Sequence, residues 1–179
     1  MNRNTVSSMT KAAILLAAGQ VLPFITGQIP QIGRMLSPMH FPVLLCGFLC
    51  GWKYGALVGF ICPLLRSVLF GMPVMFPSAV GMAFELMTYG FVTGFLSEKL
   101  GLQSIGKIYL ILIISMIAGR IVWGIAQVIL LGMTGSAFTF QAFLAGALIN
   151  AVPAIILQLL IIPYLVRIIT AKEQTVPQN

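Results

Sequence analysis

Three charged side chains stand inside long apolar stretches of the sequence: Arg66, Glu85 and Arg120. An ionised group in a hydrocarbon setting costs on the order of 3 kcal/mol, so such residues persist where they pair with one another or bind something. Two arginines and one glutamate leave one positive charge without a counter-ion. Because an arginine can hold a carboxylate through two parallel hydrogen bonds, the surplus charge predicts a site for a small anionic ligand.

Arg120 is the arginine that we assign to the ligand. Trp123 and Gln127 continue its helical face at successive spacings of three and four residues. We predict that Arg66 and Glu85 form a structural ion pair instead. The opposite assignment of the two arginines stays open.

Two further polar residues, His40 and Asn150, fall in the outer half of the predicted bundle. Gln127 and Asn150 could also be interhelical hydrogen-bond partners, and Trp123 could simply pack. His40 could equally be a solvated or capping histidine. The candidate substrate-binding residues are His40, Arg66, Glu85, Arg120, Trp123, Gln127 and Asn150.

The composition predicts an integral membrane protein. Hydrophobic residues make up 59% of the 179 residues and charged residues 7%, against roughly 25% charged in an average soluble chain. The formal net charge of +7 could suggest nucleic acid, but the basic residues stand singly at the ends of apolar segments, as membrane topology signals do. No nucleic-acid partner, cofactor or metal site is predicted, and three cysteines in apolar runs do not form a disulfide framework.

The apolar segments predict one domain, residues 1–179, folded as an all-α bundle of six transmembrane helices with both termini in the cytoplasm. The predicted helices cover approximately residues 10–26, 38–52, 54–71, 78–97, 107–131 and 139–169. The second is short for a span of ~20 residues, and the sixth contains prolines that would break or kink it. This arrangement puts seven basic residues inside (Arg3, Lys11, Lys53, Lys99, Lys107, Arg167 and Lys172) and Arg34 outside. Such an asymmetry is the positive-inside pattern.

Small residues mark a second surface, on the first helix. Ala13 and Ala17 lie one turn apart, and a face of this kind lets another helix approach closely. Packing within the bundle is the alternative explanation.

At this point the chain resembles the substrate-binding S-components of energy-coupling factor (ECF) vitamin transporters, over nearly its whole length. The resemblance depends on the Ala13–Ala17 spacing, the loop Gly27–Ser37, and the runs MHFPVLLCGFLCGWKYG and PLLRSVLFGMPVMFPSAVGMAFELMTYG. These two runs are most similar to pantothenate-type S-components.

The resemblance implies capture of a vitamin or vitamin precursor, pantothenate first, from outside a prokaryotic cell. It also implies docking through the first helix onto a membrane coupling subunit that two cytoplasmic ATPases drive. The sequence has no Gly-x-x-x-x-Gly-Lys-Ser/Thr phosphate loop, so ATP hydrolysis is expected in the partner subunits. We expect the outer loop Gly27–Ser37 to act as a lid.

Three other functions stay open. Another vitamin, such as pyridoxine, could be the substrate. A solitary ion-coupled carrier could use Glu85 as its proton carrier, although no inverted repeat of discontinuous segments is evident. A membrane enzyme is disfavoured, because a single histidine without an intramembrane aspartate offers no nucleophile–base pair.

Overall fold

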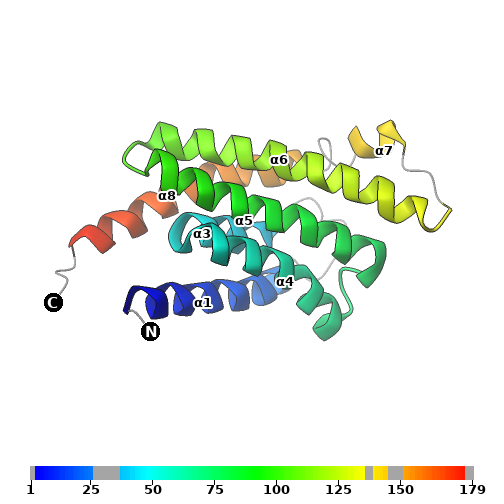
Figure 1. Cartoon of the computed structure of the whole chain (residues 1–179), viewed down its shortest axis with the longest axis horizontal. Helices are drawn as coiled ribbons and strands as arrows, with labels where there is room; N and C mark the ends of the chain where they lie inside the picture. Colours follow the sequence, from blue (N-terminus) through cyan, green and yellow to red (C-terminus); the bar gives the residue numbers. More distant parts are fainter. Residues whose placement is uncertain (1–2, 26–36, 136–138, 145–150, 176–179) are drawn as a thin grey trace.

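The computed structural model describes residues 3–25, 37–135, 139–144 and 151–175, and within these residues it is all-helical (Figure 1). A short π-helical turn, η1, lies directly before the long helix α5. The elements are α1 (Arg3–Ile25), α3 (His40–Cys50), α4 (Trp52–Phe70), η1 (Met75–Ala79), α5 (Val80–Leu100), α6 (Ile105–Gly132), α7 (Phe140–Leu144) and α8 (Val152–Thr175).

Five helical segments of the described chain are long and apolar enough to cross a membrane. They are Thr5–Phe24, Trp52–Phe70, Met75–Leu100, Ile105–Gly132 and Val152–Ala171. Helix α3 has 11 residues and reaches only about 16 Å, against the ~30 Å of a bilayer's hydrocarbon core. The six predicted helices are therefore five of spanning length and one short one.

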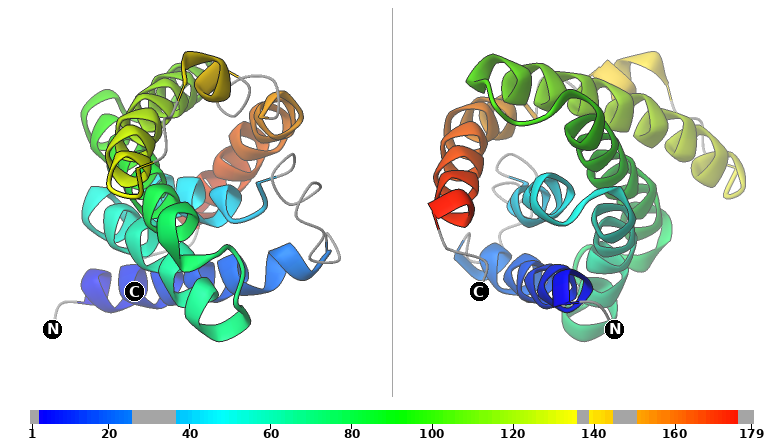
Figure 2. Two further views of the ribbon diagram at one scale, coloured as in Figure 1. Left: turned by 90° about the vertical axis from the view of Figure 1, so that its right-hand side faces the viewer. Right: turned by 60° about the vertical axis from the view of Figure 1, so that its left-hand side comes forward.

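Helix α3 lies at the centre of the bundle. The right-hand view of Figure 2 shows it surrounded by the long helices, and it packs against α1, α4, α5 and α8. Eight of its 11 residues are buried, among them His40 at its first position and Phe48 near its end. A helix too short to span the membrane thus forms the apolar core, with a polar residue at its beginning.

Glycines allow α4 and α5 to touch through their backbones. A Cβ on Gly90 would lie 2.0 Å from the carbonyl oxygen of Gly55, and one on Gly59 would lie 2.2 Å from that of Leu86. No side chain fits at such separations, so these positions require glycine. Gly55 and Gly59 belong to a repeat of glycines at every fourth position, Gly47, Gly51, Gly55 and Gly59, and these two pack inside the molecule.

Several predicted boundaries need correction. The first helix begins at Arg3 rather than near residue 10, so the polar residues before residue 10 are mostly helical. The predicted sixth helix is two elements, α7 and α8, with Pro153 in the first turn of α8 and Pro163 within it. Residues 26–36, which hold most of the predicted lid, lie outside the described residues.

The beginning of α1 and the end of α8 lie at the same end of the bundle, where α5 also turns into α6 (Figure 1). Lys99, in the last turn of α5, and Lys107, in the first turn of α6, belong to this end. This arrangement is compatible with an even number of crossings.

Candidate functional site

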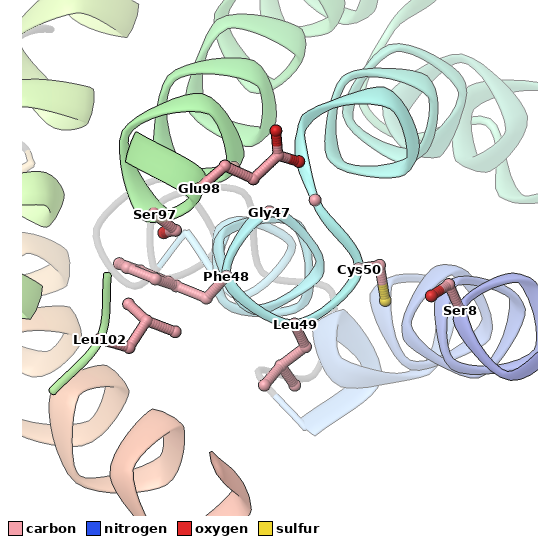
Figure 3. A pocket seen from close by; sticks show the side chains of 10 residues that line it. Ser8, Gly47, Phe48, Leu49, Cys50, Ser97, Glu98 and Leu102 are labelled. Atoms are coloured by element: carbon pink, nitrogen blue, oxygen red, sulfur yellow. The ribbon is translucent and has the colours of Figure 1, made fainter. Parts of the chain in front are cut away.

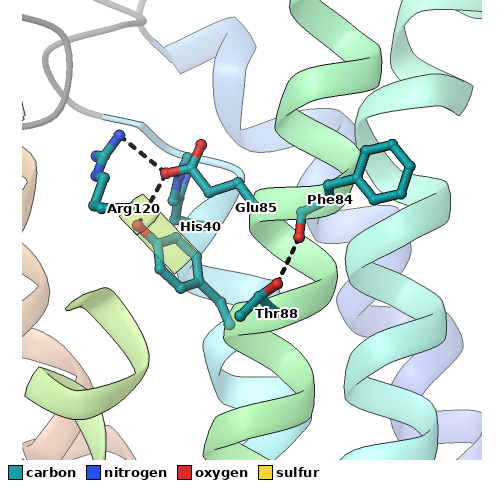
Figure 4. Close-up of polar contacts among 6 residues, drawn as sticks. His40, Phe84, Glu85, Thr88 and Arg120 are labelled. Atoms are coloured by element: carbon teal, nitrogen blue, oxygen red, sulfur yellow. Dashed lines mark hydrogen bonds and ion pairs between the residues drawn. The ribbon is translucent and has the colours of Figure 1, made fainter. Parts of the chain in front are cut away.

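The candidate site is a cluster of polar side chains around Glu85, drawn in Figure 4. The Nη1 atom of Arg120 lies 2.9 Å from Oε1 of Glu85. The hydroxyl of Tyr89 donates a hydrogen bond of 2.9 Å to the same oxygen, and Nε2 of His40 lies 3.6 Å from it. One buried carboxylate therefore gathers side chains from three helices, α3, α5 and α6.

Local structure fixes each of these side chains. The backbone N–H of His40 donates to the carbonyl oxygen of Ser37 at 3.0 Å, which places His40 in the first turn of α3. Glu85 and Tyr89 are four residues apart on α5 and share a face. On α6, a Cβ on Gly119 would lie 2.2 Å from Cε1 of Tyr89. The glycine preceding Arg120 thus gives the Tyr89 ring its place beside the arginine.

The cluster is closed on the side of Glu85 and more open on the side of Arg120. The side chains of Glu85 and His40 are 2% and 3% exposed, whereas that of Arg120 is 16% exposed. Within the described part of the chain, both ring nitrogens of His40 and Nε of Arg120 have no hydrogen-bond partner. Buried donors and acceptors without partners are uncommon and costly, so they indicate capacity for a bound polar group.

Gln127 and Trp123 extend the α6 side of the site. Gln127 is buried against α5, where a Cβ on Gly81 would lie 2.7 Å from its Nε2 atom. The Trp123 ring stacks on that of Phe143 in α7, with centroids 6.3 Å apart and an interplanar angle of 28°. Arg120 and Gln127 thus face α5, while Trp123 faces α7.

The predicted Arg66–Glu85 ion pair is wrong. Glu85 pairs with Arg120, and Arg66 points toward α1, where it donates to the backbone carbonyl of Gln20. Its guanidinium carbon lies 5.0 Å from the ring centroids of both Phe24 and Phe70. Arg66 therefore ties the C-terminal ends of α1 and α4 together through a charge-assisted hydrogen bond and two cation–π contacts.

Gln20 and Tyr89 are two polar residues that take part in these contacts and that were not predicted from the sequence. Gln20 donates to the carbonyl oxygen of Cys62 at 3.1 Å, beside the Arg66 contact. A polar residue deep in an apolar helix could have signalled Gln20. The four-residue spacing from Glu85 could have signalled Tyr89.

The remaining predicted positions are Asn150 and the two alanines of the first helix. Asn150 lies outside the described residues. Ala13 and Ala17 are exposed on α1, while Ala12 beside them is buried. The alanine pair is therefore on the exposed surface of the described bundle.

A hollow lies at the end of α3 opposite the Glu85 cluster. It has a volume of about 270 Å³, lies between α1, α3 and α5, and includes Ser8, Cys50 and Glu98 in its lining (Figure 3). Glu98 is already engaged there, since its Oε1 accepts the backbone N–H of Trp52 at 3.4 Å. The unpartnered atoms of His40 and Arg120 make the Glu85 cluster the stronger candidate.

The fold and the cluster define a multi-pass membrane protein with a polar site enclosed by helices. The chain belongs to a family of transport subunits, since the family model for "ECF transporter, substrate-specific component" matches residues 7–166. It is similar to the biotin transporter BioY of Rhizobium etli, with 32% identity over 174 residues, which cover 87% of this chain and 90% of the relative. No solved structure matches. The protein is thus a transport component and not an enzyme.

Proposed function

We propose that this protein is the substrate-binding subunit of an ECF importer for a vitamin with one carboxylate, and that biotin is this vitamin. The observation that carries the choice of vitamin is the 32% identity with a biotin transporter along most of both chains. The pantothenate expected from the two sequence runs carries the same anionic group. Pantothenate therefore serves as the comparison ligand in binding experiments, and biotin is the proposed substrate.

Arg120 is the residue that receives the carboxylate in this proposal. Its Nη1 atom is engaged by Glu85, while Nε has no partner among the described residues. The guanidinium fork has five N–H donors, so one edge can hold Glu85 while another takes a ligand carboxylate. The greater exposure of Arg120 means that an entering anion meets it before Glu85 or His40.

The rest of the site would hold the remainder of the ligand. Gln127 offers amide groups, and the stacked rings of Trp123 and Phe143 offer an apolar wall. These are suitable for a molecule such as biotin, which joins a polar ureido ring to an aliphatic chain. Asn150 stays a candidate contact.

Transport itself is assigned to partners. In this proposal both termini are cytoplasmic, the site opens to the outside, and the Ala13–Ala17 face docks on a membrane coupling subunit with two ATPases. The position of the two described chain ends on one side of the bundle supports the orientation, as does the excess of basic residues on that side.

The test is ligand identification on the purified protein. Mass spectrometry of the detergent-solubilised chain should detect biotin, and calorimetric titration should show biotin binding more tightly than pantothenate or pyridoxine. Tighter binding of pantothenate would change the vitamin but keep the carboxylate site. Binding of the uncharged pyridoxine alone would contradict the site assignment.

A further inference from the structure

His40 is a buried titratable group that the proposed carboxylate contact does not use. Its side chain is 3% exposed, and both ring nitrogens have no hydrogen-bond partner among the described residues. Its Nε2 atom nevertheless lies 3.6 Å from Oε1 of Glu85. The geometry therefore places a side chain that can carry a proton within reach of a buried carboxylate.

The charged surroundings of His40 are simple in the described structure. On α5, the Glu85 carboxylate and the Tyr89 ring both lie close to the His40 ring. Arg120 of α6 pairs with the same Glu85 carboxylate. The other elements packed on α3 carry their described titratable groups elsewhere. On α4, Cys62 and Arg66 face α1. The other described titratable groups of α1, α4 and α8 are Lys11, Lys53, Tyr54, Tyr164 and Arg167.

Counting charges in this cluster shows what an anionic ligand would do. Without ligand, Arg120 and Glu85 neutralise each other. A carboxylate added on the free edge of Arg120 places two negative charges against one positive charge. Burying an uncompensated charge is expensive, so the complex needs a second positive charge or the release of Glu85 from its pair.

We propose that the site binds its carboxylate ligand together with one proton, and that His40 takes up this proton. This inference rests on the proposed function. The proton comes from the outer solution and is held on a ring nitrogen of His40 against Glu85, and no bond of the ligand changes. The complex then contains Arg120 and His40 as cations and Glu85 and the ligand as anions.

Proton linkage has a distinct signature in the affinity. If one proton enters with the ligand, affinity for biotin should fall by about tenfold per pH unit above neutral pH. The biotin carboxylate stays ionised throughout this range, since carboxyl groups titrate near pH 4. Biotin amide, which carries no negative charge, should bind with little dependence on pH.

Titration calorimetry of the full chain in detergent tests the inference. At pH 7.5, biotin binding measured in phosphate and in Tris buffers, which differ in ionisation enthalpy, should give uptake of about one proton. His40→Gln should bind biotin with uptake near zero. Glu85→Gln serves as a second variant, because without the extra anion the biotin that it binds should be bound without proton uptake, whatever its affinity.

Each outcome is decisive. Biotin binding by the native chain without proton uptake overturns the inference and leaves the proposed function standing. Uptake that persists in His40→Gln assigns the proton to another group and also overturns it. If biotin does not bind at all, both the proposed function and this inference fail.

Discussion

Arg120 of α6 and Glu85 of α5 form an ion pair inside this bundle, with Nη1 and Oε1 2.9 Å apart. The pair joins two helices that also meet where Tyr89 packs on Gly119 and where Gln127 packs on Gly81. Its two members are unequally exposed, and Nε of Arg120 has no hydrogen-bond partner among the described residues. The same pair thus holds the helices together and presents a partly free cation.

Glu85→Gln should separate these two roles. Arg120 would lose its internal counter-ion. Removing one partner of a fully buried ion pair costs about 3–5 kcal/mol of stability, and the cost should be smaller here because Arg120 is partly exposed. The melting temperature without ligand should therefore fall. Bound biotin would supply the missing negative charge, so the rise in melting temperature on adding biotin should exceed that of the native chain. An equal or smaller rise would show that the ligand does not replace Glu85 as counter-ion.

Arg66→Gln should act on stability and leave ligand affinity unchanged. The variant removes the hydrogen bond to the Gln20 carbonyl and both contacts with Phe24 and Phe70. A lost charge-assisted hydrogen bond is worth about 1.5–3 kcal/mol, so the thermal unfolding midpoint should drop. Arg66→Lys keeps the charge and serves as the milder control. Loss of biotin affinity at native stability would instead place Arg66 in the ligand site.

The sequence predicted the helices better than it predicted which side chains meet. Long apolar runs define α4 and α6 to within about two residues at each end, because residues facing lipid and residues facing the core are both apolar. The partner of Arg66 could not be predicted from the sequence, because two side chains at similar depth on α4 and α5 can pair or can point to opposite sides. Its direction is set by α1, where Gly19 packs on Cys62 and brings Gln20 within reach.

The central position of α3 could be foreseen in part. Its short length showed that it could not span a bilayer unaided, and His40 at its beginning was a candidate from the start. The sequence did not show that His40 and Arg120 share Glu85 as a common neighbour. His40, Glu85 and Arg120 are separated by more than thirty residues from one another, and only the packing of α3, α5 and α6 brings them to one oxygen atom.

Gly90→Ala should disrupt the α4–α5 contact. The added Cβ would lie 2.0 Å from the Gly55 carbonyl oxygen, and backbone cannot move aside as a side chain can. Overpacking of this kind typically costs about 1–3 kcal/mol, and a backbone clash should reach the upper part of that range. Gly132→Ala is the matched control, because a Cβ there meets nothing within 4 Å. The effect of each variant is measured as the amount of monodisperse protein after detergent extraction. Equal yields for the two variants would contradict the requirement for glycine at the α4–α5 contact.

Ala13→Trp combined with Ala17→Trp should abolish uptake while leaving biotin binding in detergent intact. Both alanines are exposed, so the bulky rings would block an approaching helix without entering the bundle. Ile117→Trp, at a residue of α6 that is 57% exposed, is the control for a bulky ring on a lipid-facing surface. Cells should import labelled biotin normally with the control and fail with the double variant. Normal uptake by the double variant would exclude this face as the docking surface.

The central claim is that Arg120 holds the carboxylate of the ligand. It is tested most directly by measuring the affinities of native protein and Arg120→Gln for biotin and for biotin amide. The native protein should prefer the acid, and Arg120→Gln should lose roughly 2–4 kcal/mol of binding to the acid and far less to the amide, as expected for a lost charge-assisted contact. Arg120→Lys should restore part of the preference, because it keeps the charge without the fork. An unchanged preference for the acid over the amide in Arg120→Gln would contradict the account.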